Sequence, residues 1–390
     1  MIARKESISK RCMVFTVMAM LCFCVARFSH GDGFYINNGK LFDANDCEFV
    51  IRGVNHPHTW YPGEVNSIDN IANLGANTVR IVLGSGHQWT ANSVADVANV
   101  IQRCKANKLI CMLEVHDTTG YGDDPNAGSL DQAVDYWCSI APALQGQEDY
   151  VLLNIGNEPI GNSLAGCWEL ETKNAIQRLR TAGFTHTIVV DGPNWGQDWS
   201  HTMHSNAASV FAADPMANTL FSVHMYGSYI SSSVISNYLS HYVNNQIPII
   251  IGEFGDSHTD GTTVYNVDEG FIMQYAQTNG IGYLGWSWSG NGSPVQSLDM
   301  CLNFDPNQLT YWGQRIFNGT DGISSTSQLA CVFDDIIVGD CNGDQVVDLL
   351  DVQPFVEIIT SGVFLAEADV NEDGVVDLLD VGPFVDLLSQ

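Results

Sequence analysis

Between residues 33 and 318, short continuous apolar runs alternate with longer segments of helical periodicity. Eight runs have the length and composition of buried strands, and amphipathic stretches such as 93–106 and 130–144 follow them. The predicted strands are 49–55, 77–83, 109–116, 150–157, 187–191, 220–226, 248–254 and 281–288. Strands buried on both faces and separated by crossover helices form parallel sheets, and eight such units fit a (β/α)8 barrel. The pattern therefore predicts an α/β fold of the TIM-barrel type.

Polar and aromatic residues gather where these runs end. In a (β/α)8 barrel the carboxyl ends of the strands form one face, and catalytic residues lie on that face. The residues at these positions include Asn55, His56, Arg80, His116, Asp117, Asn157, Glu158, His224, Tyr226, Glu253 and Trp288.

Two glutamates carry most of the chemical information. Glu158 closes the apolar run 151–157, and Glu253 follows the run 249–252. A carboxylate at such a position costs several kcal/mol if it is buried without a partner. A salt bridge to Arg80 would explain one acid but not two. Two facing carboxyls, one protonated and one ionised, are the groups that glycoside hydrolysis needs.

The end of the chain repeats itself at an offset of 29 residues, with 340–351 returning as 369–380. Both copies place side-chain oxygens at loop positions 1, 3, 5, 9 and 12, with the carbonyl of Val346 or Val375 at position 7, as a calcium loop requires. Position 6 is Gly374 in the second loop but Gln345 in the first, which predicts a weaker first site. The predicted ligands are Asp340, Asn342, Asp344, Asp348 and Asp351, then Asp369, Asn371, Asp373, Asp377 and Asp380.

A segment with apolar residues follows each loop, and in the first copy these are Leu349, Leu350, Val352, Phe355 and Val356. Each loop is therefore expected to lead into a helix with an apolar face, which gives a small all-α module with two EF-hand-like loops. An acidic disordered tail is the alternative, and the doubled pattern of oxygens and apolar residues argues against it.

Composition and charge narrow the classes of function. The 390 residues are 45% hydrophobic, enough for one large domain and a smaller one. The formal charge of −29 repels phosphate backbones and argues against nucleic-acid binding. Residues 339–390 hold twelve Asp and Glu and no Lys or Arg, which sets this segment apart.

The first thirty residues have the pattern of a signal peptide, with basic residues before the apolar run 12–26. That run is too short to span a bilayer comfortably, so we expect a secreted protein without a stable membrane span. Eight cysteines follow the signal, and this even number permits disulfides. Their 105 full pairings leave the connectivity open, and buried free thiols are the alternative.

The barrel segment resembles glycoside hydrolase family 5, and within it the bacterial endo-β-1,4-mannanases. Similar stretches include 52–61, 76–83, 114–117 and 285–291. The resemblance implies a retaining enzyme that cleaves mannan, glucomannan or galactomannan without a cofactor. Its active-site set corresponds here to Arg80, His116, Asn157, Glu158, His224, Tyr226, Glu253 and Trp288.

The resemblance also implies a role for each residue. Glu158 would be the acid/base and Glu253 the nucleophile, which Arg80 and Tyr226 would hold ionised. His116 and His224 would position Glu158 and substrate hydroxyls, and Asn157 would bond the sugar 2-hydroxyl. We expect Trp288, rather than Trp286, to offer a flat face to the sugar. Trp60, Trp195 and Tyr61 are candidates for outer subsites, with plain packing as the alternative.

The acidic tail resembles a dockerin. The implied organisation is a signal peptide at 1–30, a catalytic domain at 31–318, a linker at 319–338 and a dockerin-like module at 339–390. The resemblance implies bound calcium and a cohesin-type partner on a scaffold or cell surface. Calcium loops that only stabilise the module are the alternative.

Two rival functions fit the same sequence features. An endo-β-1,4-glucanase would use the same barrel and the same glutamates, because mannose and glucose differ at a single hydroxyl. A non-catalytic carbohydrate-binding barrel is the other, and the presence of both glutamates argues against it.

Overall fold

The computed structural model describes residues 33–334, 337–343, 346–362, 364–371 and 373–389. The predicted signal peptide at 1–30, the candidate calcium ligand Asp344 and its neighbour Gln345 lie outside the described residues.

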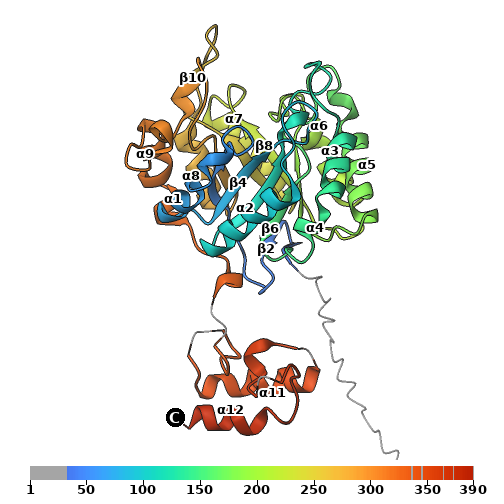
Figure 1. Cartoon of the computed structure of the whole chain (residues 1–390), viewed down its shortest axis with the longest axis vertical. Helices are drawn as coiled ribbons and strands as arrows, with labels where there is room; N and C mark the ends of the chain where they lie inside the picture. Colours follow the sequence, from blue (N-terminus) through green and yellow to red (C-terminus); the bar gives the residue numbers. More distant parts are fainter. Residues whose placement is uncertain (1–32, 335–336, 344–345, 363, 372, 390) are drawn as a thin grey trace, which may run out of the picture. The chain divides into compact units, whose positions relative to one another are not determined.

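Eight parallel strands close into a barrel, as the sequence predicted (Figure 1). Strands follow one another around the ring in chain order, and the last pairs with the first. Each coincides with one predicted run, with ends that differ by a few residues. The strands are β3 (Arg52–His56), β4 (Thr78–Leu83), β5 (Ile110–Val115), β6 (Val151–Asn154), β7 (Ile188–Asp191), β8 (Thr219–Met225), β9 (Ile249–Phe254) and β12 (Gly282–Gly285).

Helices cover the outside of the ring (Figure 1). Helix α2 begins where the Ser93 hydroxyl accepts from the amide of Asp96, a typical N-cap, and buries Val97, Val100 and Cys104 on one face. The predicted helix 130–144 is two helices, with Pro142 in the first turn of the second. The helices of the barrel are α1 (Ser67–Asn73), α2 (Val94–Ala106), α3 (Leu130–Ser139), α4 (Ala141–Leu144), α5 (Trp168–Thr181), α6 (Thr202–Phe211), α7 (Ser232–Asn244), α8 (Glu269–Asn279), α9 (Tyr311–Asn318) and α10 (Ile323–Thr326).

Shorter elements complete the barrel, and they include the hairpins β1–β2 and β10–β11. The short strands are β1 (Tyr35–Asn37), β2 (Lys40–Phe42), β10 (His258–Thr259) and β11 (Val264–Tyr265). The 3-10 turns are η1 (Pro62–Glu64), η2 (His116–Thr118), η3 (Ala165–Cys167), η4 (Gln296–Leu298), η5 (Leu302–Phe304) and η6 (Cys331–Phe333).

Side chains along each strand alternate between two cores. In β5, Cys111, Leu113 and Val115 belong to the core that includes the helices. Ile110 and Met112 belong to a second core inside the ring, and Glu114 follows them in the same alternation. The apolar lower part of the barrel therefore supports a layer of polar side chains at the carboxyl ends of the strands.

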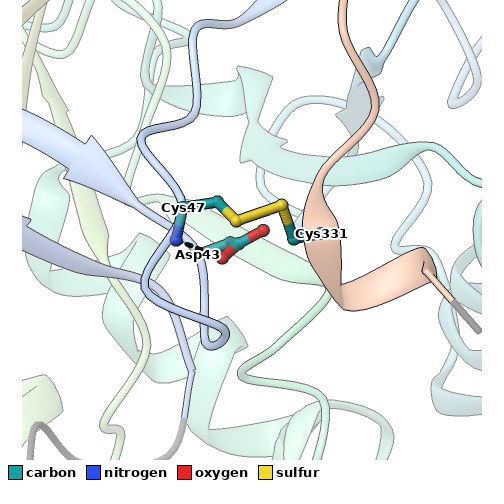
Figure 2. A group of neighbouring side chains, drawn as sticks. All are labelled: Asp43, Cys47 and Cys331. Carbon is teal, nitrogen blue, oxygen red and sulfur yellow. Dashed lines mark hydrogen bonds between the residues drawn. A yellow bond between two sulfur atoms is a disulfide. The ribbon is translucent and has the colours of Figure 1, made fainter. Parts of the chain in front are cut away.

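Part of the predicted linker 319–338 packs on the barrel instead. Ile323 is fully buried and Ala330 is 2% exposed. Cys331 forms a disulfide with Cys47, which lies 284 residues away in the chain (Figure 2). The buried Asp43 carboxylate accepts from the amides of Cys47 and Val332 and so joins the same two segments. The expectation of a linker from residue 319 is wrong because apolar residues in this segment complete the barrel core.

The other cysteines that the structure describes are free thiols, which fits the alternative of unpaired residues. Cys104, Cys111 and Cys301 are buried, whereas Cys138 and Cys167 are exposed and Cys341 is partly buried. Among the described residues, no helix combines the length and apolar character needed to cross a bilayer.

The acidic tail forms two similar units, each with a short turn and a helix. The helices are α11 (Val352–Ser361) and α12 (Val381–Leu388), and the turns include η7 (Leu349–Asp351) and η8 (Ala366–Ala368). Phe355 and Phe384 stack with ring centroids 3.9 Å apart and form the small core with Ala368.

The apolar residues before these helices face solvent. Leu349 and Leu378 are each 77% exposed, and Leu350 and Leu379 are each 67% exposed. Of the residues predicted to give the first helix its apolar face, only Phe355 is buried.

Candidate active site

Glu158 and Glu253 face each other at the carboxyl ends of the strands. Glu253 lies in β9, and Glu158 lies four residues beyond the end of β6. A carboxylate oxygen of each lies within 4.8 Å of the other. Glu253 is 4% exposed and the side chain of Glu158 is 13% exposed. The pair is accessible but largely removed from water.

Two donors hold the carboxylate of Glu253. Arg80 Nη1 donates to Oε1 at 3.0 Å, and the Tyr226 hydroxyl donates to Oε2 at 3.0 Å. Burial and the two glutamates raise the pKa of Tyr226 well above its usual value, so the hydroxyl keeps its proton. Hydrogen bonds from a cation and a hydroxyl stabilise an ionised carboxylate.

Arg80 is fully buried, and every part of its guanidinium has a partner. Burial alone would lower its pKa, but neighbouring carboxylates, foremost Glu114, outweigh this and raise it. Because each of its nitrogens donates a hydrogen bond, the guanidinium has little freedom to move and fixes the positions of the surrounding oxygens. Its partners besides Glu253 are Asn55 Oδ1 at 2.8 Å, Asn154 Oδ1 at 2.8 Å, Asn157 Oδ1 at 2.8 Å and Asp191 Oδ2 at 3.3 Å.

Glu158 has a different partner. His224 Nδ1 lies 2.8 Å from Oε1 of Glu158 and 3.5 Å from Oε2 of Glu253. Burial would lower the pKa of His224, but Glu253 and Asp191 outweigh it and raise the pKa to about 10. Burial raises the pKa of Glu158, and His224 acts in the opposite direction. A carboxyl with a raised pKa beside a carboxylate with two donors suits general acid–base catalysis.

Three buried polar residues in this layer were missed at the level of sequence: Glu114, Asn154 and Asp191. Asp191 Oδ2 lies 3.1 Å from His224 Nε2 without hydrogen-bond geometry, so this contact is an ion pair. Burial would raise the pKa of Asp191, but His224 and Arg80 lower it to about 2. Asp191 closes the apolar run of β7 as Glu158 closes its own, so the same signal pointed to it.

His116 pairs with Glu114 and lies against three tryptophans, rather than pairing with Glu158. Its Nδ1 lies 2.8 Å from Glu114 Oε1, and this contact raises the pKa of the imidazole although burial would lower it. Its ring contacts Trp60 edge-on at 5.0 Å, Trp89 at 5.4 Å and, in a stacked arrangement, Trp286 at 5.6 Å. The three indoles are half-buried, so each keeps part of its surface exposed.

The expectation that Trp288 faces the sugar is wrong. Trp288 is 0% exposed and packs in the core beside Phe317 of α9, with ring centroids 6.1 Å apart. Trp286 is the partly exposed residue of the two, and its Nε1 donates to Asn291 Oδ1 at 3.0 Å. Strand β12 ends at Gly285, so strand alternation gives no guide to residues 286–288.

Glu158, His224 and Glu253 offer ligand atoms within 4.8 Å of one another, a spacing that a metal ion could bridge. The three groups pair with one another instead, since His224 Nδ1 lies 2.8 Å from Glu158 Oε1 and 3.5 Å from Glu253 Oε2. Asp43, Cys47 and Cys331 also lie together, but the disulfide takes both sulfurs (Figure 2).

The two repeated loops curl around their carboxylates in the same way. Asp351 accepts from the amides of Asn342 and Asp348 at 2.9 and 2.8 Å. Asp380 accepts from the corresponding amides of Asn371 and Asp377 at 3.1 and 2.8 Å.

Both carboxylates are 0% exposed, although no Lys or Arg occurs between 339 and 390. Buried carboxylates without cationic side chains fit a bound divalent cation. Gly374 has φ +84°, which explains the glycine at position 6 of the second loop.

Two family models match the chain. The cellulase model (glycosyl hydrolase family 5) matches residues 42–292, and the dockerin type I domain matches residues 338–382. Dockerin type I domains bind calcium.

The similar proteins include mannan endo-1,4-beta-mannosidases. The one from Streptomyces lividans is 54% identical over 338 residues, 85% of this chain and 87% of that protein. The one from Cellvibrio japonicus is 46% identical and covers 81% of this chain and 73% of its own. The solved structure of a beta-mannanase from Thermomonospora fusca has a TM-score of 0.75 and 56% identity, over 77% of this chain and 99% of that one.

Proposed function

Because the chain belongs to glycosyl hydrolase family 5, we propose that it is an endo-acting β-1,4-mannanase that cleaves internal bonds with retention of configuration. The observation that carries the substrate is the 54% identity to the Streptomyces lividans mannan endo-1,4-beta-mannosidase over 85% of the chain. Mannan, glucomannan and galactomannan are the proposed substrates.

The spacing of the glutamates supports a double displacement. Carboxyls about 5–5.5 Å apart leave no room for a water between acid and sugar, so one of them attacks directly. The oxygens of Glu158 and Glu253 within 4.8 Å of each other fit this class.

Glu253 attacks the anomeric carbon and forms a glycosyl ester while Glu158 gives its proton to the departing oxygen. In the second step Glu158 takes a proton from water, and the water oxygen displaces Glu253. The surroundings of the two carboxyls suit these roles. Arg80 and Tyr226 direct the oxygens of Glu253, and burial favours the protonated form of Glu158.

Asn157 is the proposed partner of the sugar 2-hydroxyl. Its Oδ1 accepts from Arg80 and its Nδ2 donates to Thr119 at 2.9 Å. An amide nitrogen carries two hydrogens, so the second is available to the sugar. The partly exposed faces of Trp60, Trp89 and Trp286 are the proposed stacking surfaces for neighbouring sugar rings.

The C-terminal module is the proposed attachment device. Calcium in the two loops would hold helices α11 and α12 in place, and a cohesin-type protein would bind the module. The exposed leucines 349, 350, 378 and 379 form the proposed contact surface. Together with the predicted signal peptide, such a module supports a proposed location outside the cell, on a scaffold or cell surface.

Reducing-sugar release from galactomannan, glucomannan and carboxymethylcellulose tests the proposal. The Glu253→Gln variant is the blank, because it keeps the shape of the side chain and removes the nucleophile. We expect release from both mannans and a loss of at least about 10³-fold in the variant.

The family's description as a cellulase keeps β-1,4-glucan hydrolysis as the second candidate. Release from carboxymethylcellulose before the mannans would establish it. No release from any polysaccharide would contradict both activities and favour a carbohydrate-binding barrel.

A further inference from the structure

Asp191 lies between Arg80, which holds Glu253, and His224, which contacts Glu158. It ends β7 and is 1% exposed, so its carboxylate does not reach the space above the strands. Its Oδ1 accepts from Asn154 Nδ2 at 3.1 Å. Its Oδ2 faces three groups: Arg80 Nη2, His224 Nε2 and the backbone amide of Glu158.

The contact with the Glu158 backbone holds a residue in an uncommon backbone conformation. Glu158 has φ +41°, in the left-handed region that side chains other than glycine rarely adopt. Asp191 Oδ2 accepts from its amide at 3.1 Å, and the amide of Gly120 donates to its carbonyl at 2.9 Å. The backbone on both sides of this side chain is therefore held from neighbouring loops and strands.

The contact with His224 reaches the side chain of the same glutamate. His224 stands between two carboxyls, with Nε2 3.1 Å from Asp191 and Nδ1 2.8 Å from Glu158. A carboxylate beside an imidazole favours the protonated form of the ring and restricts its orientation. Asp191 thus acts on Glu158 by two routes, through its backbone and through His224.

The charges of the buried layer also depend on Asp191. Its carboxylate lies 3.3 Å from Arg80 Nη2 and 3.1 Å from His224 Nε2. Without Asp191 the layer loses the negative charge beside these two groups, which disfavours the protonated imidazole that contacts Glu158.

We propose that Asp191 is a positioning residue for the acid/base Glu158 and serves proton donation to the leaving group rather than attack by Glu253. The inference rests on the proposed glycosidase function. Its effect is expected where the leaving group needs a proton and is small where it does not.

The test compares Asp191→Asn with a matched control, Asp198→Asn. Asp198 is also fully buried after β7, but it caps α6 through the amides of Met203 and His204, outside the site. Each variant is assayed by kcat/KM on phenyl and 2,4-dinitrophenyl β-mannotriosides, because dinitrophenolate departs without a proton. Thermal unfolding is measured in parallel, and Asp191→Ser replaces Asp191→Asn if the latter does not unfold cooperatively.

We expect Asp191→Asn to lower kcat/KM about 10- to 100-fold on the phenyl substrate and about threefold or less on the dinitrophenyl substrate. Asp198→Asn should lower the unfolding temperature and leave both values within about threefold. Equal losses on the two substrates, or the same pattern in the control, would overturn the proposal. Wild-type activity of Asp191→Asn on both substrates would also overturn it. If the wild-type protein itself were inactive, the proposed function would be overturned instead.

Discussion

At the scale of the residue, Glu158 and Glu253 differ in the groups that surround them. Glu253 receives donors from a buried cation and a hydroxyl, whereas Glu158 is desolvated and touches one imidazole. The backbone of Glu158 is also strained at φ +41°. Such strain costs about 1–3 kcal/mol and persists only where neighbours enforce it, here Asp191 and Gly120. Identical side chains thus acquire different chemistry.

A change at His224 should move the alkaline limb of the pH profile. The His224 cation lowers the pKa of Glu158, against the effect of burial. In His224→Gln that influence is lost, so Glu158 should keep its proton to higher pH. We expect the alkaline limb of kcat/KM to move upward by about one pH unit, with lower maximal activity. A profile from pH 4 to 10 on mannan would contradict this if the limb moved downward.

The two tryptophans after β12 should respond differently to alanine. Trp286→Ala removes a partly exposed face beside His116, so the KM for mannan-oligosaccharides should rise about 5- to 50-fold with little loss of stability. Trp288→Ala empties a buried position and should cost about 3–5 kcal/mol of folding free energy. Kinetics and thermal unfolding of both variants provide the check. A stability loss confined to Trp286→Ala would reverse our assignment.

At the scale of the element, distant segments close the amino-terminal end of the barrel. The hairpin β1–β2 and the segment around Ala330 share a core with inward residues of the strands. The Cys47–Cys331 disulfide and the carboxylate of Asp43 join them (Figure 2). These contacts lie at the amino-terminal ends of the strands, whereas the glutamates lie at the carboxyl ends.

Removal of this disulfide should lower stability and spare catalysis. A cross-link across 284 residues restricts the unfolded chain strongly, and the chain-entropy account gives about 5–6 kcal/mol. Cys47→Ser with Cys331→Ser should therefore lower the unfolding temperature by about 5–10 °C. Activity at 25 °C should remain within about twofold. An exposed cysteine, Cys138→Ser, is the control and should change neither quantity.

At the scale of the whole molecule, the chain combines a barrel with a module that has its own core and charge. The module buries Asp351 and Asp380 within a segment that has no Lys or Arg. We therefore expect its stability to depend on cations from solution, whereas the ion pairs of the active site are all internal to the barrel.

Substitution of a proposed calcium ligand should weaken calcium binding by the module and leave hydrolysis by the barrel unchanged. In Asp369→Ala the second loop loses its first proposed oxygen ligand, so calcium affinity should fall at least tenfold while mannan hydrolysis is unchanged. Asp386→Ala is the control, because this acid is exposed on α12 outside the loops. Calorimetric titration with calcium and a reducing-sugar assay give the two readouts. A parallel loss of hydrolysis in Asp369→Ala would show that the two parts are coupled.

The sequence by itself determined the eight strands, the two glutamates and the doubled calcium loops. Each is a local property: a continuous apolar run, a polar residue at its end, or oxygens at fixed spacing within twelve residues. Parallel strands bring their carboxyl ends to one face, so local patterns sufficed to place Arg80, His224 and Tyr226 beside the glutamates.

Only the tertiary structure decided what depends on contacts between distant residues. The pairing of Cys47 with Cys331 was one of many, and only the closed barrel brings them together. The choice of Trp286 over Trp288 follows from packing against α9, beyond the last residue of a strand. The place of Asp191 between Arg80, His224 and Glu158 exists because three strands and a loop converge, and no spacing along the chain encodes that convergence.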